Sequence, residues 1–315
     1  MKISEYLEDV RDKNSYVDIL IGEDNIDEER FIDLYTIMHL SNRAEGVIYR
    51  DRILKKVSTF FKILLKEIRN QGSNGFKSKI GELSKNMHEA KYTNLGYSQG
   101  GSGKAFGKEK FYELITSIKN STAFSTNHIN DILDTELYIK GIGVDLISDM
   151  ITNLIYDILS EYTSSKVGKL LKNEYISEID ITYWDEIKCE WNKKKMPTIL
   201  YYNSNKVPQN YLLTPFSYTC GSRQKEILLK KISDDYIFGI FELEIFGDPQ
   251  KYKKYISIKK DNSRHVYKKD IVNMLNDTIG ENTAVQNGRR ITSKGLLDIV
   301  ERYPEIKKYI ESKIK

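Results

Sequence analysis

Two aspartates four residues apart follow a glycine turn near the middle of the chain. They are Asp145 and Asp149, and Asn153 follows at the same interval. In a helix, side chains at this spacing lie on one stripe, so the two carboxylates would be near neighbours and would repel each other. A divalent cation between them would turn this repulsion into chelation, and oxygen ligands of this kind suit Mg²⁺ or Mn²⁺. We therefore predict that Asp145 and Asp149 are metal ligands.

The same residues also have a structural interpretation. The segment from Asp145 to Thr163 predicts one amphipathic helix, with Asp149 and Asn153 on the side opposite the apolar residues. Asp145 would then cap the helix N-terminus, where the macrodipole favours a carboxylate. Asp149 and Asn153 would simply face solvent.

The tripeptide Glu186-Ile187-Lys188 offers a second set of reactive groups. It resembles the E-x-K part of the D…(D/E)xK set of restriction-endonuclease-like nucleases. In that set the carboxylates hold magnesium and the lysine orients or activates a water molecule. Asp149 or Asp157 could supply the upstream carboxylate, so the predicted catalytic residues are Asp149, Glu186 and Lys188. The alternative is an exposed turn or strand edge, because glutamate and lysine are common in this chain.

A glycine-rich loop over residues 96–107 precedes a predicted helix at 109–119. Backbone amides of such a loop, with a helix N-terminus behind them, can hold an anion. We therefore predict that Gly101, Gly103 and Lys104 contact phosphate. The loop is not a Walker A motif, because Ala105 follows Lys104 where a hydroxyl is required for magnesium. A plain connecting loop is the alternative.

Residues 133–155 resemble the helix-hairpin-helix motif, in which a Gly-x-Gly turn donates amides to a nucleic-acid phosphate. The matching turn here is Gly141-Ile142-Gly143. Asp145 and Asp149 depart from the motif, since they would repel a phosphate without an intervening cation. The run Gly-x-Gly-x-Asp-x-Ile-Ser-Asp is also similar to one in bacterial proteins encoded beside mobile-element defence genes. These resemblances imply nucleic-acid binding by Gly141 and Gly143 and a role in phage defence.

Residues 50–69 predict a strong amphipathic helix. Apolar residues recur on one face, and most of the lysines and arginines lie elsewhere: Arg50, Arg52, Lys55, Lys56, Lys62 and Lys66. Such a basic face could meet DNA phosphates or a partner protein. A solvated face over a core helix is the alternative.

Composition limits the class of protein. Hydrophobic and charged contents of 40% and 30% are typical of a globular chain, and 49 basic against 45 acidic residues is only a mild excess. No apolar run approaches the roughly 18 residues that cross a bilayer, so we expect no membrane partner. The acidic amphipathic start predicts no signal peptide, and two cysteines without CxxC spacing fit a reducing cytoplasm.

Several other chemistries lack their motifs. The four histidines show no HxH or HExxH spacing, which disfavours zinc hydrolysis. No GxGxxG dinucleotide fingerprint occurs either.

We predict a mixed α+β fold, with a mainly helical domain at 1–172 that includes the glycine-rich loop, and a smaller α/β domain at 173–315 that ends in helices. The expected function is a Mg²⁺- or Mn²⁺-dependent nuclease or nucleic-acid-processing protein of a bacterial phage-defence or restriction system, with DNA as the favoured substrate. The alternative is a non-catalytic DNA- or protein-binding subunit of a defence complex.

Overall fold

The computed structural model describes residues 1–8, 15–22, 26–72, 74–97, 107–139, 142–167, 175–221, 236–280, 283–285 and 290–314. The fold is mixed α+β, as predicted. Its contacts divide the chain into two compact units, residues 1–133 with 142–222 and residues 134–141 with 223–315. The predicted boundary at residues 172/173 lies outside the described residues, and the first unit continues past it to include a three-stranded sheet.

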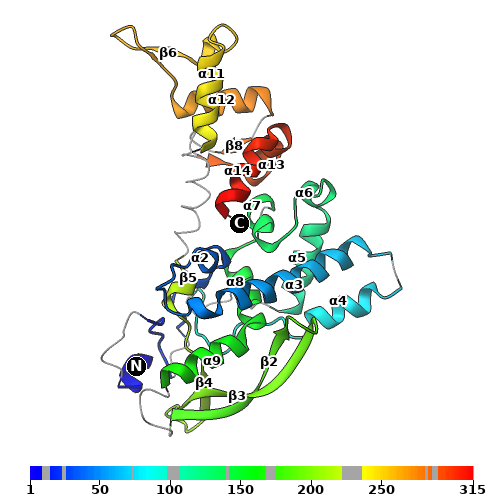
Figure 1. Ribbon diagram of the computed structural model, residues 1–315, viewed down its shortest axis with the longest axis vertical. Helices are drawn as coiled ribbons and strands as arrows, with labels where there is room; N and C mark the ends of the chain where they lie inside the picture. The colour runs from blue at the N-terminus through cyan, green and yellow to red at the C-terminus, as the bar shows by residue number, and fades with distance from the viewer. Residues whose placement is uncertain are drawn as a thin grey trace. The chain divides into compact units, whose positions relative to one another are not determined.

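The first unit contains helices before and after a small sheet (Figure 1). Its elements are α1 (Ile3–Tyr6), β1 (Phe31–Ile32), α2 (Leu34–Met38), the 3₁₀ helix η1 (Val47–Tyr49), α3 (Arg50–Arg69), α4 (Phe76–Ser84), α5 (Lys108–Lys119), α6 (Thr122–Ser125), α8 (Val144–Leu154), α9 (Tyr156–Val167), β2 (Ile176–Asp185), β3 (Glu190–Tyr202), β4 (Pro208–Tyr211), η3 (Phe216–Tyr218) and β5 (Thr219–Cys220). Helix α7 (Ile132–Tyr138) lies where the chain passes from the first unit to residues 134–141.

Helix α3 has the predicted bounds, and its apolar stripe forms the centre of the first unit's core. Seven stripe residues are at most 2% exposed: Ile53, Val57, Phe60, Phe61, Leu64, Leu65 and Ile68. Lys56 is buried with them at 0% exposure, although its charge placed it on the expected solvated face. Burying an ammonium group is costly unless it is paired and hydrogen-bonded, so several acceptors must surround Lys56.

Strands β2, β3 and β4 form an antiparallel sheet in chain order. The hairpin β2–β3 pairs Ile176 with Ile199 at one end and Asp185 with Glu190 at the other. Helices α3, α8 and α9 pack against β2, and Figure 1 shows α9 running along the hairpin. The E-x-K tripeptide therefore occupies the turn between two long strands, as its structural alternative expected.

The predicted single helix from Asp145 to Thr163 is two helices, because α8 ends before Ile155 and α9 starts at Tyr156. Their polar residues near this break are buried: Asp149, Asn153 and Asp157 are 5%, 1% and 4% exposed. The polar arc expected to face solvent is thus covered by other parts of the first unit. The hydrophobic pattern could not show this, because it identifies the apolar face of a helix but not what covers the polar one.

The second unit holds helices with short two-stranded ribbons between them. Its elements are α11 (Phe238–Gly247), η5 (Lys253–Tyr255), β6 (Ser257–Ile258), β7 (Arg264–His265), α12 (Lys268–Thr278), β8 (Ala284–Val285), β9 (Arg290–Ile291), α13 (Ser293–Arg302) and α14 (Pro304–Ile314). The unit ends in helices, as predicted. Helix α13 stops before Pro304, whose ring cannot continue a helix, and α14 begins there.

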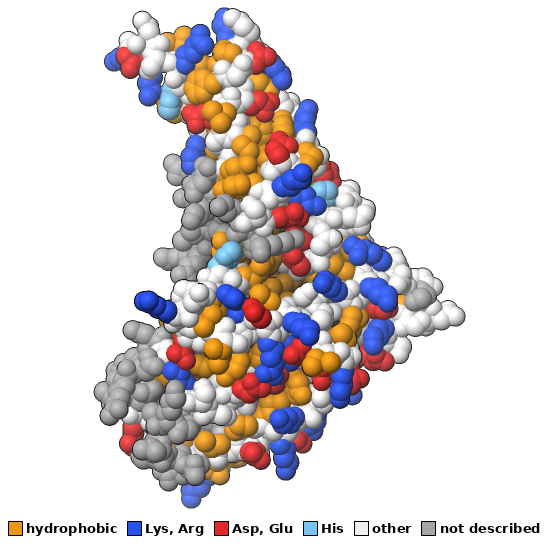
Figure 2. Space-filling view, viewed as in Figure 1, with side chains coloured by type: hydrophobic (Ala, Val, Ile, Leu, Met, Phe, Trp, Pro, Cys, Tyr) orange, Lys and Arg blue, Asp and Glu red, His pale blue; other side chains and the backbone are white. Residues whose placement is uncertain are grey.

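Basic and acidic side chains are interspersed on the face drawn in Figure 2, which agrees with the small net charge of +4. Among the described residues, no helix combines the length and apolar character needed to cross a bilayer.

Gly46, which precedes η1, has a left-handed backbone with φ of +75°. The Tyr218 hydroxyl donates to its carbonyl at 2.6 Å, and a Cβ at this position would lie 2.5 Å from the same hydroxyl oxygen. We expect Gly46→Ala to lower the free energy of unfolding by about 1–3 kcal/mol, because it adds both backbone strain and a clash. Urea unfolding measures this.

Gly81→Ala is the matched control. Gly81 lies inside α4 with open space around it, so alanine should be neutral there or stabilising by up to about 1 kcal/mol. Equal unfolding midpoints for the two variants would contradict the tight packing at Gly46.

Candidate functional site

Four carboxylates of the first unit form what we call the acidic group: Asp27, Glu89, Asp145 and Asp149. Helix α8 carries the last two, one turn apart. Asp145 Oδ1 and Asp27 Oδ2 both lie beside Gly96, 3.4 and 3.5 Å from where a Cβ on that glycine would be. A larger residue at Gly96 would therefore crowd both carboxylates, so the glycine leaves room for them.

Asp149 is held under the segment 88–90. The Ala90 amide donates to Asp149 Oδ1 at 3.3 Å, and the Asn153 amide group donates to the carbonyls of His88 and Asp149 at 2.6 and 2.7 Å. Asn153 Oδ1, by contrast, is buried and has no hydrogen-bond partner among the described residues. These contacts tie the segment to α8 and leave one amide oxygen unsatisfied beside the helix.

Each of the three aspartates has a raised pKa. Burial raises the pKa of Asp149 to about 8, and the charges of Asp145, Glu89 and Asp27 add to the effect. Burial and then the neighbouring carboxylates Glu89 and Asp145 raise the pKa of Asp27. Burial also raises the pKa of Asp145, against the opposing effect of Lys110. The acidic group therefore concentrates negative potential that a bound proton or cation would relieve.

The acidic group does not amount to a complete metal site. Among the described residues, no three His, Cys, Asp or Glu side chains are arranged to hold a metal ion. Mg²⁺, however, is commonly held by only one or two carboxylates together with water and substrate phosphates. The acidic group could supply such a partial shell, with Asp145 and Asp149 as its protein ligands.

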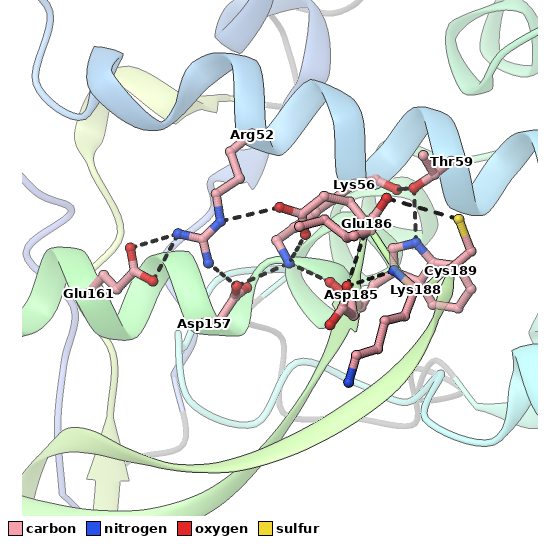
Figure 3. Close-up of polar contacts among 11 residues, drawn as sticks. Arg52, Lys56, Thr59, Asp157, Glu161, Asp185, Glu186, Lys188 and Cys189 are labelled. Carbon is pink, nitrogen blue, oxygen red and sulfur yellow. Dashed lines mark hydrogen bonds and ion pairs between the residues drawn. The ribbon is translucent and has the colours of Figure 1, made fainter.

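A second set of charged residues surrounds the buried Lys56 ammonium group (Figure 3). Its Nζ lies 3.0 Å from Asp157 Oδ2 and 2.7 Å from Glu186 Oε2, and it donates to the Trp184 carbonyl. All three ammonium hydrogens therefore have acceptors. Through Lys56, helix α3 is connected to α9 and to the β2–β3 turn.

Arg52, one turn earlier on α3, extends this ion-pair network. Its guanidinium contacts both oxygens of Glu161 at 2.8 and 2.7 Å, pairs with Asp157, and places Nε 3.5 Å from Glu186 Oε1. Lys56 and Arg52 together lower the pKa of Glu186. Burial dominates at Asp157, whose pKa is raised despite the same two cations. Its Oδ1 is buried and has no hydrogen-bond partner in the part of the chain that the structure describes.

The predicted catalytic residues fall into different surroundings. The groups that act on Asp149 belong to the acidic group, whereas those that act on Glu186 are Lys56 and Arg52. Of the two proposed upstream carboxylates, Asp157 is the one beside Glu186, with Lys56 between them. The Lys188 side chain extends away from the network in Figure 3, while its backbone amide donates to Asp185 Oδ1 at 2.9 Å.

Four of the residues predicted to contact phosphate lie outside the described residues: Gly101, Gly103, Lys104 and Gly141. Gly143 is described, and it precedes α8 as the N-cap residue with extended backbone.

The sequence did not connect Asp27 or Glu89 with Asp145 and Asp149, and it placed Lys56 on a basic face of the helix. The position of Lys56 nevertheless indicated that it could be buried. It lies three residues after Ile53 and four before Phe60, at the margin of the apolar stripe, where a lysine must either reach outward or find buried carboxylates. The acidic group joins three distant segments, and no pattern in a single sequence predicts such a contact.

A family model described as "Domain of unknown function (DUF8370)" matches residues 9–223, which is more than half of the chain. The match ends next to the end of the first unit, so it spans both the acidic group and the ion-pair network. A search of curated proteins found no match, and a search of solved structures found none either.

We expect Lys56→Met to lower the free energy of unfolding by about 3 kcal/mol or more, because Asp157 and Glu186 would lose a buried cation. Lys55→Met is the matched control, since Lys55 is exposed on the same helix and should change stability by less than about 0.5 kcal/mol. Chemical denaturation of both variants tests this. Similar losses for the two lysines would contradict the structural role of the buried one.

The raised pKa of Asp149 predicts a pH dependence of stability. The folded state holds the proton up to about pH 8, whereas an unfolded aspartate releases it near pH 4. Folded chains therefore bind more protons in this window, and the free energy of unfolding should fall as pH rises from about 4 to about 8.

Asp149→Asn should flatten that slope, since asparagine keeps an acceptor for the Ala90 amide but cannot ionise. The measurement is urea unfolding at several pH values in chelator-treated buffer. Glu178→Gln, which removes an exposed carboxylate on β2, should leave the slope unchanged. A wild-type slope that persists in Asp149→Asn would refute the assignment.

Proposed function

This chain belongs to the family described as a domain of unknown function (DUF8370), and we propose that it is a divalent-metal-dependent nuclease or nucleic-acid-processing protein of a bacterial phage-defence or restriction system. The observation that carries the proposal is the acidic group. Asp145 and Asp149 lie together with Asp27, and burial, followed by like-charged neighbours, raises the pKa of Asp149 and Asp27. Such an arrangement favours a bound cation over free carboxylates.

In this proposal Asp145 and Asp149, with Asp27 from the segment beside Gly96, would hold Mg²⁺ or Mn²⁺. Without a cation, these carboxylates would repel a phosphodiester. A bound cation would supply the chemistry of metal-assisted phosphodiester hydrolysis, namely neutralisation of phosphate charge and a lower pKa for water.

Glu186 and Lys188 do not belong to the acidic group. Glu186 contacts Lys56 and Arg52, which gives it a positioning role in the turn of the β2–β3 hairpin. Their assignment as catalytic residues remains a prediction, and so does phosphate binding by the glycine-rich loop.

The alternative function is a non-catalytic DNA- or protein-binding subunit, and an exposed stripe on α3 favours it. Lys55, Lys62, Lys66 and Arg69 are all exposed, and at 100° per residue they lie within a narrow arc of the helix. Arg52 and Lys56, which were expected on this face, are committed to the internal network. The four remaining cations suit contacts to successive phosphates along a strand.

The two functions separate in one assay, in which the purified protein is incubated with DNA and with RNA, with and without Mg²⁺ or Mn²⁺. We expect cation-dependent cleavage by the wild type, and a loss of about a hundredfold or more in Asp149→Asn, because a metal ligand would be weakened. Glu178→Gln is the matched control and should cleave like the wild type.

Full cleavage by Asp149→Asn would remove the acidic group from the mechanism. Binding without cleavage, weakened when Lys62 and Lys66 are replaced by alanine, would favour the non-catalytic subunit.

A further inference from the structure

Positive charge is concentrated in one segment of the second unit, residues 251–270. This segment holds eight lysines and arginines but only two aspartates, so its net charge is +6 in a chain whose net charge is +4. The remaining residues of the chain are therefore slightly negative together, at −2. All eight cations of the segment are exposed. The mild basic excess of the chain thus comes from this segment alone.

The centre of the segment is an antiparallel ribbon, formed by strands β6 and β7 with the turn between them, and it projects from α11 and α12 (Figure 1). The Lys259 amide donates to the Ser263 carbonyl across the turn at 2.9 Å. Asp261 is the one carboxylate of the ribbon, and its Oδ1 accepts from the Ser263 amide and hydroxyl at 3.0 and 2.6 Å. The ribbon therefore presents Lys259, Lys260 and Arg264 around a turn with internal hydrogen bonds of its own.

The base of the ribbon is fastened to the rest of the unit by two tyrosines. Tyr252 and Tyr255 precede β6 and are 4% and 6% exposed. The Tyr252 hydroxyl donates to Glu244 on α11, and the Tyr255 hydroxyl donates to Asp277 on α12 at 2.7 Å. Lys254 pairs with the same Asp277 at 2.7 Å. These contacts hold the base in place, and both carboxylates already have partners inside the unit.

Several of the exposed cations lack such a partner. Within the described ranges, no carboxylate lies at ion-pair distance from Lys253, Lys259, Lys260 or Arg264, in contrast to Lys254. These four cations lie within twelve residues of the chain. They repel one another and together attract a ligand that carries several negative charges.

The shape and the side chains of the ribbon select among such ligands. Ile258, at 73% exposure, is the one large apolar side chain that the ribbon exposes, whereas a membrane-binding surface needs a wider apolar face. A two-stranded β-ribbon is one of the elements that the major groove of B-DNA admits. From Ser257 to Asp261 the chain extends at most about 13 Å, at about 3.3 Å per residue, and the groove is about 8.5 Å deep. The ribbon is therefore long enough to reach base edges.

We propose that this ribbon enters the major groove of double-stranded DNA. Lys259, Lys260 and Arg264 supply positive charge in the groove, and Lys253, which precedes the ribbon, adds a contact to the phosphate backbone. The inference deepens the proposed function, on which it rests for a nucleic-acid substrate, and it names duplex DNA as the form that is bound. The ribbon belongs to the second unit and shares no residue with the acidic group.

Fluorescence anisotropy of the full chain tests the proposal with short duplexes of DNA and of RNA that have the same sequence. A chelator in the buffer keeps cleavage and cation binding out of the measurement. We expect the DNA duplex to bind, and the RNA duplex to bind at least about tenfold more weakly, because the major groove of A-form RNA is too narrow for protein side chains. Cosedimentation with phosphatidylserine vesicles is the parallel test for a membrane surface.

The double variant Lys259→Ala with Lys260→Ala should weaken binding to the DNA duplex by about tenfold or more, and it should reduce the slope of log affinity against log salt by about 2. The matched control is Lys294→Ala with Lys308→Ala, which removes the same charge from exposed positions on α13 and α14. Its affinity should stay within about twofold of wild type, with an unchanged salt slope.

The proposal is overturned if the DNA duplex does not bind, if RNA binds as tightly, or if the control weakens binding as much as the ribbon variant. It is also overturned if vesicles bind and DNA does not. Binding that depends on Lys62 and Lys66 but not on Lys259 and Lys260 would assign the DNA to α3 instead. Duplex binding through the ribbon without cleavage in any divalent cation would contradict the nuclease and support the ribbon, so the two failures are distinguishable.

Discussion

The buried ammonium group of Lys56 is the interaction on which the arrangement of the first unit depends. It connects α3 with two later parts of the chain, α9 and the β2–β3 hairpin, because its acceptors are Asp157, Glu186 and the Trp184 carbonyl. An unpaired charge at this depth would cost several kcal/mol, so the three elements have to meet at the same point. Arg52 repeats the requirement one turn earlier and brings in Glu161.

Burial raises the pKa of the carboxyl groups at both charged sites, but the charges that surround them differ. Around Lys56 the cations and carboxylates nearly balance, and the pKa of Glu186 is lowered. Around Asp149 the nearby charges that act on it are carboxylates, and its pKa is raised to about 8. The first site is electrostatically complete apart from one oxygen of Asp157, whereas the second gains free energy from any proton or cation that it binds. Because of this contrast, we propose a structural role for the residues around Lys56 and cation binding for the residues around Asp149.

The sequence predicted local features well and long-range contacts poorly. Helix α3 has the expected bounds because its apolar spacing is regular over five turns, and the E-x-K tripeptide lies in a turn, as its structural alternative held. Asp145 and Asp149 are neighbours because they share a helix. The pattern could not place Asp27 and Glu89 beside them, nor show that the polar arc of α8 is covered. Contacts of that kind depend on tertiary packing, which the period of a single helix does not encode.

The break between α8 and α9 at Ile155 sets how far α9 is rotated about its own axis relative to α8. Ile155 is fully buried, and its amide bonds back to the Ile151 and Thr152 carbonyls at 3.2 Å. One residue inserted here would turn α9 by about 100° and swing Asp157 away from Lys56, while Asp149 kept its own partners. The spacing of the chain at this joint therefore matters more than the identity of any residue in it, and natural variation in length should be absorbed elsewhere.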